Sequence, residues 1–446
     1  VNMQLPNLWL WEMIDEFIYQ FQSFCQYRGK LSVKTKEELA LLKDCDQVWN
    51  VVGVLNYLQA LVDKSEIVSV LEKERAGLDN FSEKEGYDYH SSNVLRTLGY
   101  FSLIGLHRIH VLLGDYTTAL KVLDPIDLNK PGIFTKVPGA SVSTAYHVGF
   151  AYFMSKRYTD AIRHFNASLV FINRHKVGAT RPYSLDLLLK KQEQMYALVA
   201  MCVVLGGGAG GGQSGFATTT VTRLLEEGVV GSLREKHGDD MSRMGQGVVS
   251  AFDELFSYSC PKFVTPAPPA GAAAGAGVVA AAAGGGEEGA AAAGGGAAGG
   301  GNNAATNYNE EAYRQQLRLF LTEVASYDKL PVLRSFLKLY TTISVAKLAD
   351  LMDTDAATLR QQLTCMKQKS RCVEWRGGAS ALDGVSVCIS DVDFNVGAGD
   401  MIHVTDVTPP KRNGDYFLRH LAKQNTLMED LAPAKPLVFK GNLAAV

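Results

Sequence analysis

Through the first 205 residues, bulky apolar side chains recur at the three- and four-residue spacing of an amphipathic helix. Pro6 suits the first turn of such a helix, whose apolar face would then hold Leu10, Ile14, Phe17, Ile18 and Phe21. The same spacing returns over Val48–Val62, Leu95–Leu113 and Tyr183–Val204. We therefore predict a domain built from successive helices over residues 1–205.

An internal repeat lies within this region. The small residues Gly149 and Ser168 would let two antiparallel helices approach closely, while Phe165 would fill the groove between them. Ala161 has a counterpart in a weaker copy, Ala119, which lies 42 residues upstream. A regular tetratricopeptide array repeats every 34 residues or about that. The spacing therefore predicts an irregular, tetratricopeptide-like solenoid.

The pattern changes after residue 306, where a helix-turn-helix is followed by short alternating segments. Two helices are predicted over Tyr313–Tyr327 and Val332–Tyr340, and two more begin after Ser344 and Asp355, which are good N-cap residues. Apolar and polar residues then alternate, as in strands, at 372–375, 392–396 and 401–404. This order of elements predicts a winged helix.

Two low-complexity stretches, one Gly-rich and one rich in Ala, Gly and Pro, divide the chain. The fold class is therefore mainly α, with helical repeats that run into a winged helix with a small sheet and a last helix over Arg412–Met428. The predicted parts are a helical-repeat domain at 1–205, a Gly-rich insertion at 206–215, a helical continuation at 216–265, a disordered linker at 266–305, helices plus a winged helix at 306–410, and an interaction helix and tail at 411–446.

The composition indicates a cytoplasmic protein without bulk affinity for nucleic acid. Forty-four Lys and Arg residues against 46 Asp and Glu residues give a formal charge of −2, so only a local patch would contact RNA or DNA. The seven cysteines include no CxxC pair, which argues against a zinc site and favours a reducing compartment. We expect no membrane contact, because the strongly apolar run Ala197–Leu205 is too short to cross a bilayer.

Candidate sites for chemistry have simpler explanations. The segment Gly206–Gly211 matches the dinucleotide pattern GxGxxG, but it follows a charged, helix-periodic run instead of a strand. His107 and His110 would share a helical face, yet no third metal ligand stands at a suitable spacing. We therefore predict no catalytic residues, cofactor, metal or small-molecule substrate, and expect that the protein is not an enzyme.

The helix-turn-helix raises the alternative of a nucleic-acid-binding regulator. Its second helix and the residues just after it carry a modest basic face, formed by Arg360, Lys367, Lys369 and Arg371. A solvated helix has the same composition, so contact with phosphates is one hypothesis and a plain surface is the other.

Helical repeats that run into a winged helix resemble the PCI module, which is shared by subunits of the proteasome lid, the signalosome and translation initiation factor 3. Longer blocks are similar to one family within it, subunit L of eukaryotic translation initiation factor 3. These blocks are Leu5–Phe24, Leu98–Leu103, Leu113–Tyr116, Phe256–Phe263, Arg334–Thr342 and Ser380–Gly384. A PCI subunit of the proteasome lid or the signalosome remains the alternative within the module.

The resemblance implies a non-catalytic scaffold subunit that binds other subunits, K and E among them, and the small ribosomal subunit, with mRNA or rRNA contacted indirectly. It also implies that the winged helix docks edge to edge with its neighbours and that the last helix joins a helical bundle. The residues expected to serve these contacts are Val392, Phe394, Val396, Ile402 and Val404 in the strands, and Tyr416, Leu418 and Leu421 in the helix.

Overall fold

The computed structural model describes residues 3–83, 92–128, 130–175, 182–206, 224–266, 307–327, 329–378, 380–390, 392–397, 399–406 and 413–431. Apart from Gly206 and Pro266, the predicted Gly-rich insertion and the predicted linker lie outside these residues, as does the tail beyond 431.

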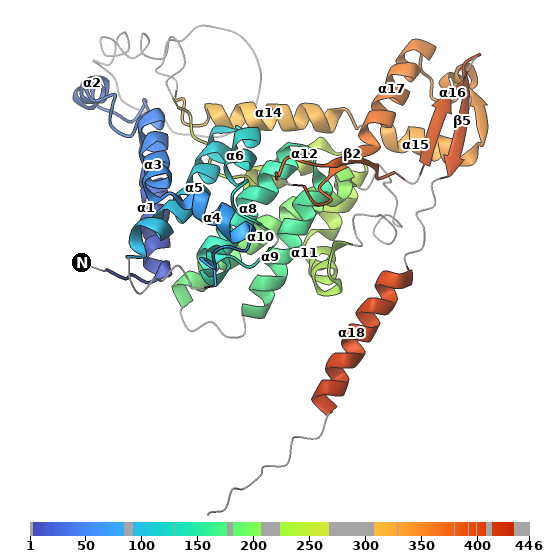
Figure 1. The fold of residues 1–446 in the computed structure, drawn as a ribbon. Coiled ribbons are helices and arrows are strands. Elements are labelled where there is room, and N and C mark those ends of the chain that lie inside the picture. The colour runs from blue at the N-terminus through green and yellow to red at the C-terminus, as the bar shows by residue number, and fades with distance from the viewer. Residues whose placement is uncertain are drawn as a thin grey trace, which may run out of the picture.

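The chain is mainly helical, as predicted (Figure 1). The first part of the chain forms a stack of helices: α1 (Asn7–Gly29), α2 (Lys36–Asp44), α3 (Val51–Ser65), α4 (Ile67–Arg75), α5 (Val94–Leu113), α6 (Tyr116–Val122), α7 (Ile133–Lys136), α8 (Pro138–Met154), α9 (Tyr158–His175), α10 (Pro182–Gly206), α11 (Glu227–Gly245) and α12 (Val249–Ser259). After residue 306 come α14 (Glu311–Ala325), α15 (Leu330–Leu339), α16 (Val345–Leu351), α17 (Ala356–Lys369) and α18 (Asn413–Leu431).

The strands are short and form two separate antiparallel sheets. They are β1 (Thr342–Ser344), β2 (Arg371–Glu374), β3 (Val385–Cys388), β4 (Val392–Val396) and β5 (Met401–Asp406). One sheet has the order β1-β5-β4, and β2 pairs only with β3 in the other. We expected the segment after α17 to join a single small sheet, but β2 instead turns toward the helical stack and packs on α9.

The apolar stripe predicted near the start of the chain is confirmed in α1. Leu10, Ile14, Ile18 and Phe21 are buried, while Phe17 is half-buried at the edge of the stripe. This face packs against α5, as does the inner face of α3. Burial of such a face stabilises a helix far more than intrinsic propensity does.

The predicted close approach of two helices is confirmed at α8 and α9. A Cβ atom added at Gly149 would lie 2.4 Å from the ring of Phe165, so only glycine fits there without displacement. The buried ring of Phe150, the next residue of α8, has its centroid 6.1 Å from that of Tyr116 and 5.9 Å from that of Phe263. Aromatic side chains thus fill the centre of the stack.

The two ends of the segment 267–306 are fixed side by side on the stack. The backbone N–H of Val264 donates to the carbonyl of Leu112 at 2.9 Å, and that of Tyr308 donates to the carbonyl of Gly29 at 2.9 Å. The hydroxyl of Thr265 then donates to the carbonyl of Tyr308 at 3.2 Å. The chain therefore re-enters the stack close to the point where it leaves.

Helix α14 joins the stack to the winged helix. The ring of Phe320 stacks on that of Phe256 with centroids 4.7 Å apart, and Phe320 and Val324 belong to the core of the stack. Figure 1 shows α14 running from the stack toward α15 and α17.

The winged helix has a hydrophobic core of its own. Leu333, Leu348 and Leu363 pack from the helices onto Phe394 and Ile402 of the sheet. The predicted N-caps are confirmed, because the side chain of Ser344 accepts from the N–H of Lys347 and that of Asp355 accepts from the N–H of Ala357. None of the described helices has the length and apolar character needed to cross a bilayer.

Two histidines lie buried and neutral in the stack. The Nδ1 atom of His107 lies 2.8 Å from the carbonyl of Ala119, and that of His147 lies 2.7 Å from the carbonyl of Ser143. Burial lowers the pKa of His107 to about 4 and holds the pKa of His147 well below its usual value. Both side chains are therefore part of the core.

This burial predicts loss of stability in mild acid. The unfolded chain takes up a proton at His107 below about pH 6.5, whereas the folded chain does so only near pH 4, so stability is complete above 6.5 and falls between these values. From pH 7 to pH 5 we expect His107 alone to lower the free energy of unfolding by about 2 kcal/mol, measured by urea unfolding. A His107→Gln variant with the same pH dependence as the parent chain would contradict this account.

Candidate functional site

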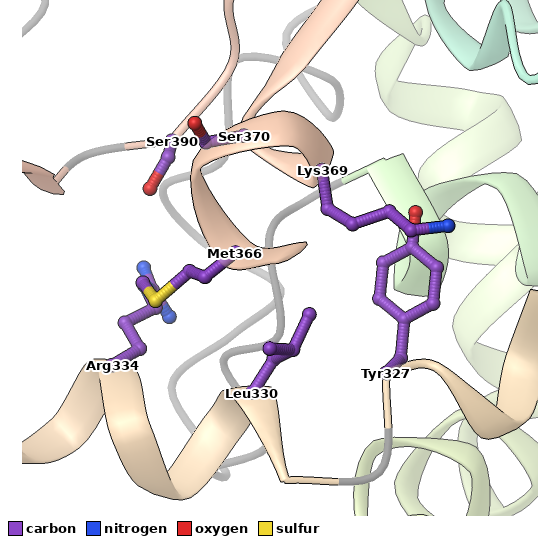
Figure 2. Close-up of a pocket in the computed structure, with 7 residues that line it drawn as sticks. All are labelled: Tyr327, Leu330, Arg334, Met366, Lys369, Ser370 and Ser390. Atoms are coloured by element: carbon purple, nitrogen blue, oxygen red, sulfur yellow. The ribbon is translucent and has the colours of Figure 1, made fainter. Parts of the chain in front are cut away.

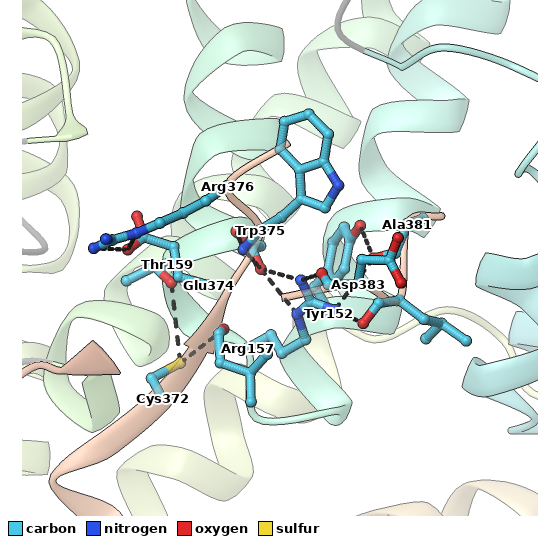
Figure 3. A network of polar contacts seen from close by, with 12 residues as sticks. Tyr152, Arg157, Thr159, Cys372, Glu374, Trp375, Arg376, Ala381 and Asp383 are labelled. Carbon is cyan, nitrogen blue, oxygen red and sulfur yellow. Dashed lines mark hydrogen bonds and ion pairs between the residues drawn. The ribbon is translucent and has the colours of Figure 1, made fainter. Parts of the chain in front are cut away.

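A dense network of polar contacts lies where the β2–β3 hairpin meets the helical stack (Figure 3). Arg157, between α8 and α9, is only 6% exposed. Its Nε atom donates to Oδ2 of Asp160 at 2.8 Å, and its two terminal nitrogens donate to the carbonyls of Ala381, Leu382 and Asp383 at 3.1, 2.9 and 2.9 Å. One guanidinium thus holds three consecutive carbonyls of the loop that follows β2. We call Arg157, Asp160 and the loop residues 375–378 and 380–384 the hairpin clamp.

Asp160 binds the other side of the same loop. Its carboxylate is 3% exposed and accepts from the backbone N–H of Trp375 at 3.1 Å. Burial raises the pKa of this carboxyl, while Arg157 and Arg163 favour its charged form. Because an isolated buried carboxylate is costly, these partners are what permit its position inside the protein.

Helices α6 and α8 contribute further contacts to the hairpin clamp. Oδ1 of Asp124, just after α6, accepts from the hydroxyl of Ser380 at 2.7 Å and from the N–H of Ala381 at 3.1 Å. The hydroxyl of Tyr152 donates to the carbonyl of Ala381 at 2.8 Å, and the guanidinium of Arg157 lies over the Tyr152 ring. The loop is therefore attached to several elements of the stack at once.

Sequence reasoning missed the hairpin clamp. Arg157 and Asp160 stand at the turn of the predicted helical repeat, where solvated polar residues are ordinary. The one available signal was the block Ser380–Gly384, which resembles the subunit L family and proves to be the bound loop. Neither residue could be paired with that loop from spacing, because more than 200 positions separate them.

A second junction centres on Glu323 of α14. Its carboxylate binds Lys156 of the stack at 2.6 Å and also pairs with Lys369 of α17. Both Glu323 and Lys369 are 15% exposed. Lys369, predicted as a possible phosphate contact, therefore ties the winged helix to the stack.

A half-open cleft lies beside Lys369 (Figure 2). It encloses about 310 Å³ of empty space, part of it open solvent, and is lined by Tyr327, Leu330, Arg334, Met366, Lys369, Ser370 and Ser390. Its surface is mostly apolar, and the ammonium of Lys369 lies over the ring of Tyr327. No group of three or more His, Cys, Asp or Glu residues in the described ranges is placed to hold a metal ion.

The other predicted nucleic-acid contacts are mostly paired with carboxylates. Arg360 binds Asp400 at 2.6 Å, and Lys367 pairs with Asp393 and donates to the carbonyl of Phe394 at 2.8 Å. Arg371 is exposed in β2. Nucleic-acid binding by this face stays a prediction, and the internal ion pairs weigh against it.

The strand residues predicted to bind partners divide between core and surface. Val392, Phe394 and Ile402 are buried in the winged-helix core, and Val404 packs against it. Val396 is exposed. Strand β5 is central, whereas β1 and β4 form the two edges of its sheet, so of the two predicted strands only β4 can accept a partner strand.

Helix α18 carries exposed apolar side chains. Leu418 and Leu421, both predicted as contacts, are 65% and 53% exposed, while the side chain of Tyr416 lies outside the described residues. Three further apolar residues of this helix that sequence reasoning did not name are also exposed, namely Phe417, Leu427 and Met428. Figure 1 shows α18 apart from the stack and the winged helix.

Comparison with known proteins gives one consistent family. Residues 1–424 match the family described as Paf67, RNA polymerase I-associated factor PAF67. The chain is 40% identical over 432 residues to eukaryotic translation initiation factor 3 subunit L of Nematostella vectensis, an alignment that covers 97% of this chain and 73% of the relative. The proteins of the same name from Homo sapiens and Xenopus tropicalis are 42% and 41% identical over 430 residues, with 96% of this chain and 68% of each relative covered.

Proposed function

The chain belongs to the subunit L family of eukaryotic translation initiation factor 3, and on this premise we propose that it is a non-catalytic scaffold of that complex. It would bind other PCI subunits, K and E among them, and support assembly of the small-subunit preinitiation complex and mRNA recruitment in the cytoplasm. The observation that carries the proposal is the apolar face of α18.

That face has the spacing of an interaction helix. Phe417, Leu421 and Met428 fall on one side of α18, with Leu418 next to them, and all four are more than half exposed. A single helix of 19 residues is marginal in water unless its apolar face is buried. Helices from neighbouring subunits would supply that burial.

The winged helix offers a second contact through the edge of β4. Its backbone pairs with β5 on one side, so a neighbouring winged helix would extend the sheet from the other side. The hairpin clamp and the Glu323 junction support this role, because they fix the winged helix on the stack and so fix the direction in which β4 faces.

The α18 contact is tested by substitution on its apolar face. Leu421→Asp combined with Met428→Asp should lower recovery of the other subunits with the tagged full chain by about tenfold or more, because charges would enter a buried contact. Thr426→Asp, on the opposite face of the same helix, is the matched control and should leave recovery unchanged. Full recovery of all subunits with the double variant would rule out α18 as the contact.

A further inference from the structure

Helix α1 has an apolar line that runs from the edge of the core onto the exposed surface. Trp9 and Met13 of α1 are 55% and 51% exposed and, with the half-buried Phe17, lie along one line at intervals of four residues. The ring of Phe17 lies 5.2 Å from that of Trp49, just before α3. We call Trp9, Met13, Phe17 and Trp49 the outer stripe.

Phe17 and Trp49 of the outer stripe pack against the edge of the core, whereas Trp9 and Met13 extend it onto the exposed surface. The opposite face of α1 already packs on α5, and Figure 1 shows α1 and α3 at the edge of the stack. Trp49 has a φ of 51°, an uncommon backbone conformation for a bulky residue.

The charges around the outer stripe define what would cover it. Glu12 and Glu16 are exposed one row further round α1, and Asp44 and Asp46 are exposed before Trp49. Helix α1 contains no Lys or Arg before Arg28. Because Lys43 is exposed beside Asp44, the acidic border is the one that Glu12 and Glu16 form on α1 itself. An apolar line with such a border is complementary to an apolar line bordered by cations.

From this geometry we propose that the outer stripe binds an amphipathic helix of another protein subunit whose apolar face is flanked by Lys or Arg. The line from Trp9 to Phe17 is about 12 Å long, which matches two to three turns of a partner helix. Trp and Met are enriched at the centres of interfaces, and the carboxylates would orient the partner. This inference rests on the proposed function in one respect, because the partner is taken to be another subunit of the proposed complex.

Photo-crosslinking from the outer stripe tests the proposal. The full chain is assembled into its complex with p-benzoylphenylalanine in place of Trp9, and with the same group in place of Leu319 of α14, 62% exposed, as a matched control. We expect position 9 to crosslink to a segment of another subunit with helical apolar spacing and flanking Lys or Arg. A crosslink to an acidic segment, to RNA, to a second copy or within the chain would overturn the proposal, as would a yield no higher than that of the control.

Charge reversal provides the second arm. Glu12→Lys with Glu16→Lys should lower the crosslink yield by about tenfold or more, and Lys→Glu or Arg→Glu changes in the identified segment should restore it. Failure of the matched reversal to restore the yield would also overturn the proposal. Absence of the chain from the complex would refute the proposed function, whereas a chain that assembles but gives no crosslink would refute the outer stripe alone.

Discussion

Replacement of Arg157 by alanine should lower the free energy of unfolding by about 3–5 kcal/mol, because it removes one partner of a buried ion pair. Asp160, 3% exposed, would lose its main counter-charge, and three loop carbonyls would lose their donor. Urea unfolding of the full chain measures the loss. The loop should also become open to trypsin after Arg376, which reports on the hairpin clamp itself.

Two variants separate the hairpin clamp from a general effect of charge. Arg163 is 38% exposed, so Arg163→Ala should cost only about 1 kcal/mol or less. Arg157→Lys keeps the charge but lacks the planar guanidinium that donates to Asp160 and to three carbonyls. The stability of this variant should therefore fall between those of the parent and Arg157→Ala. If Arg157→Ala and Arg163→Ala cost the same and cleavage after Arg376 does not change, the hairpin clamp does not hold the loop.

Introduction of leucine at Gly149 should destabilise the stack by about 3 kcal/mol. The added Cβ atom would lie 2.4 Å from the Phe165 ring, so α8 and α9 must separate or the ring must leave its rotamer. This cost exceeds the gain in helix propensity from replacing glycine, which is about 1 kcal/mol. Thermal and urea unfolding measure the difference.

A double-mutant cycle identifies the cause. Phe165→Ala alone should cost about 3–5 kcal/mol, because it leaves a cavity beside Gly149. In the presence of Phe165→Ala, the leucine at 149 has room, so the two costs should not add. Additive costs would show that the helices respond to something other than this contact.

Elements of the fold were predictable from the sequence where local interactions determine them. Helices with one buried face, such as α1 and α3, and the capped helices after Ser344 and Asp355 were recognisable because their pattern is local. Helix α2 has no buried residue and β3 no buried side chain, so neither produces an apolar pattern to detect. Both were missed.

The contacts between the winged helix and the stack could not be predicted from the local sequence pattern. Lys369 was grouped with Arg360 as part of a basic face, yet one meets Glu323 of α14 and the other Asp400 beside β5. A periodicity argument assigns a residue to a face of its own helix but not to the element that covers the face. The predicted contact residues of β4 were likewise not divided into core and surface residues. Phe394 is buried in the core, whereas Val396 is exposed.

The paired anchoring of Val264 and Tyr308 lowers the cost of changing the length of the segment between them. Because its two ends are already fixed side by side by the stack, the entropy of closing the loop grows only with the logarithm of its length, by about 0.6 kcal/mol for each doubling. Expansion of an Ala/Gly tract there leaves the helical packing intact. The same geometry makes this position an insertion point for a tag or a whole folded domain.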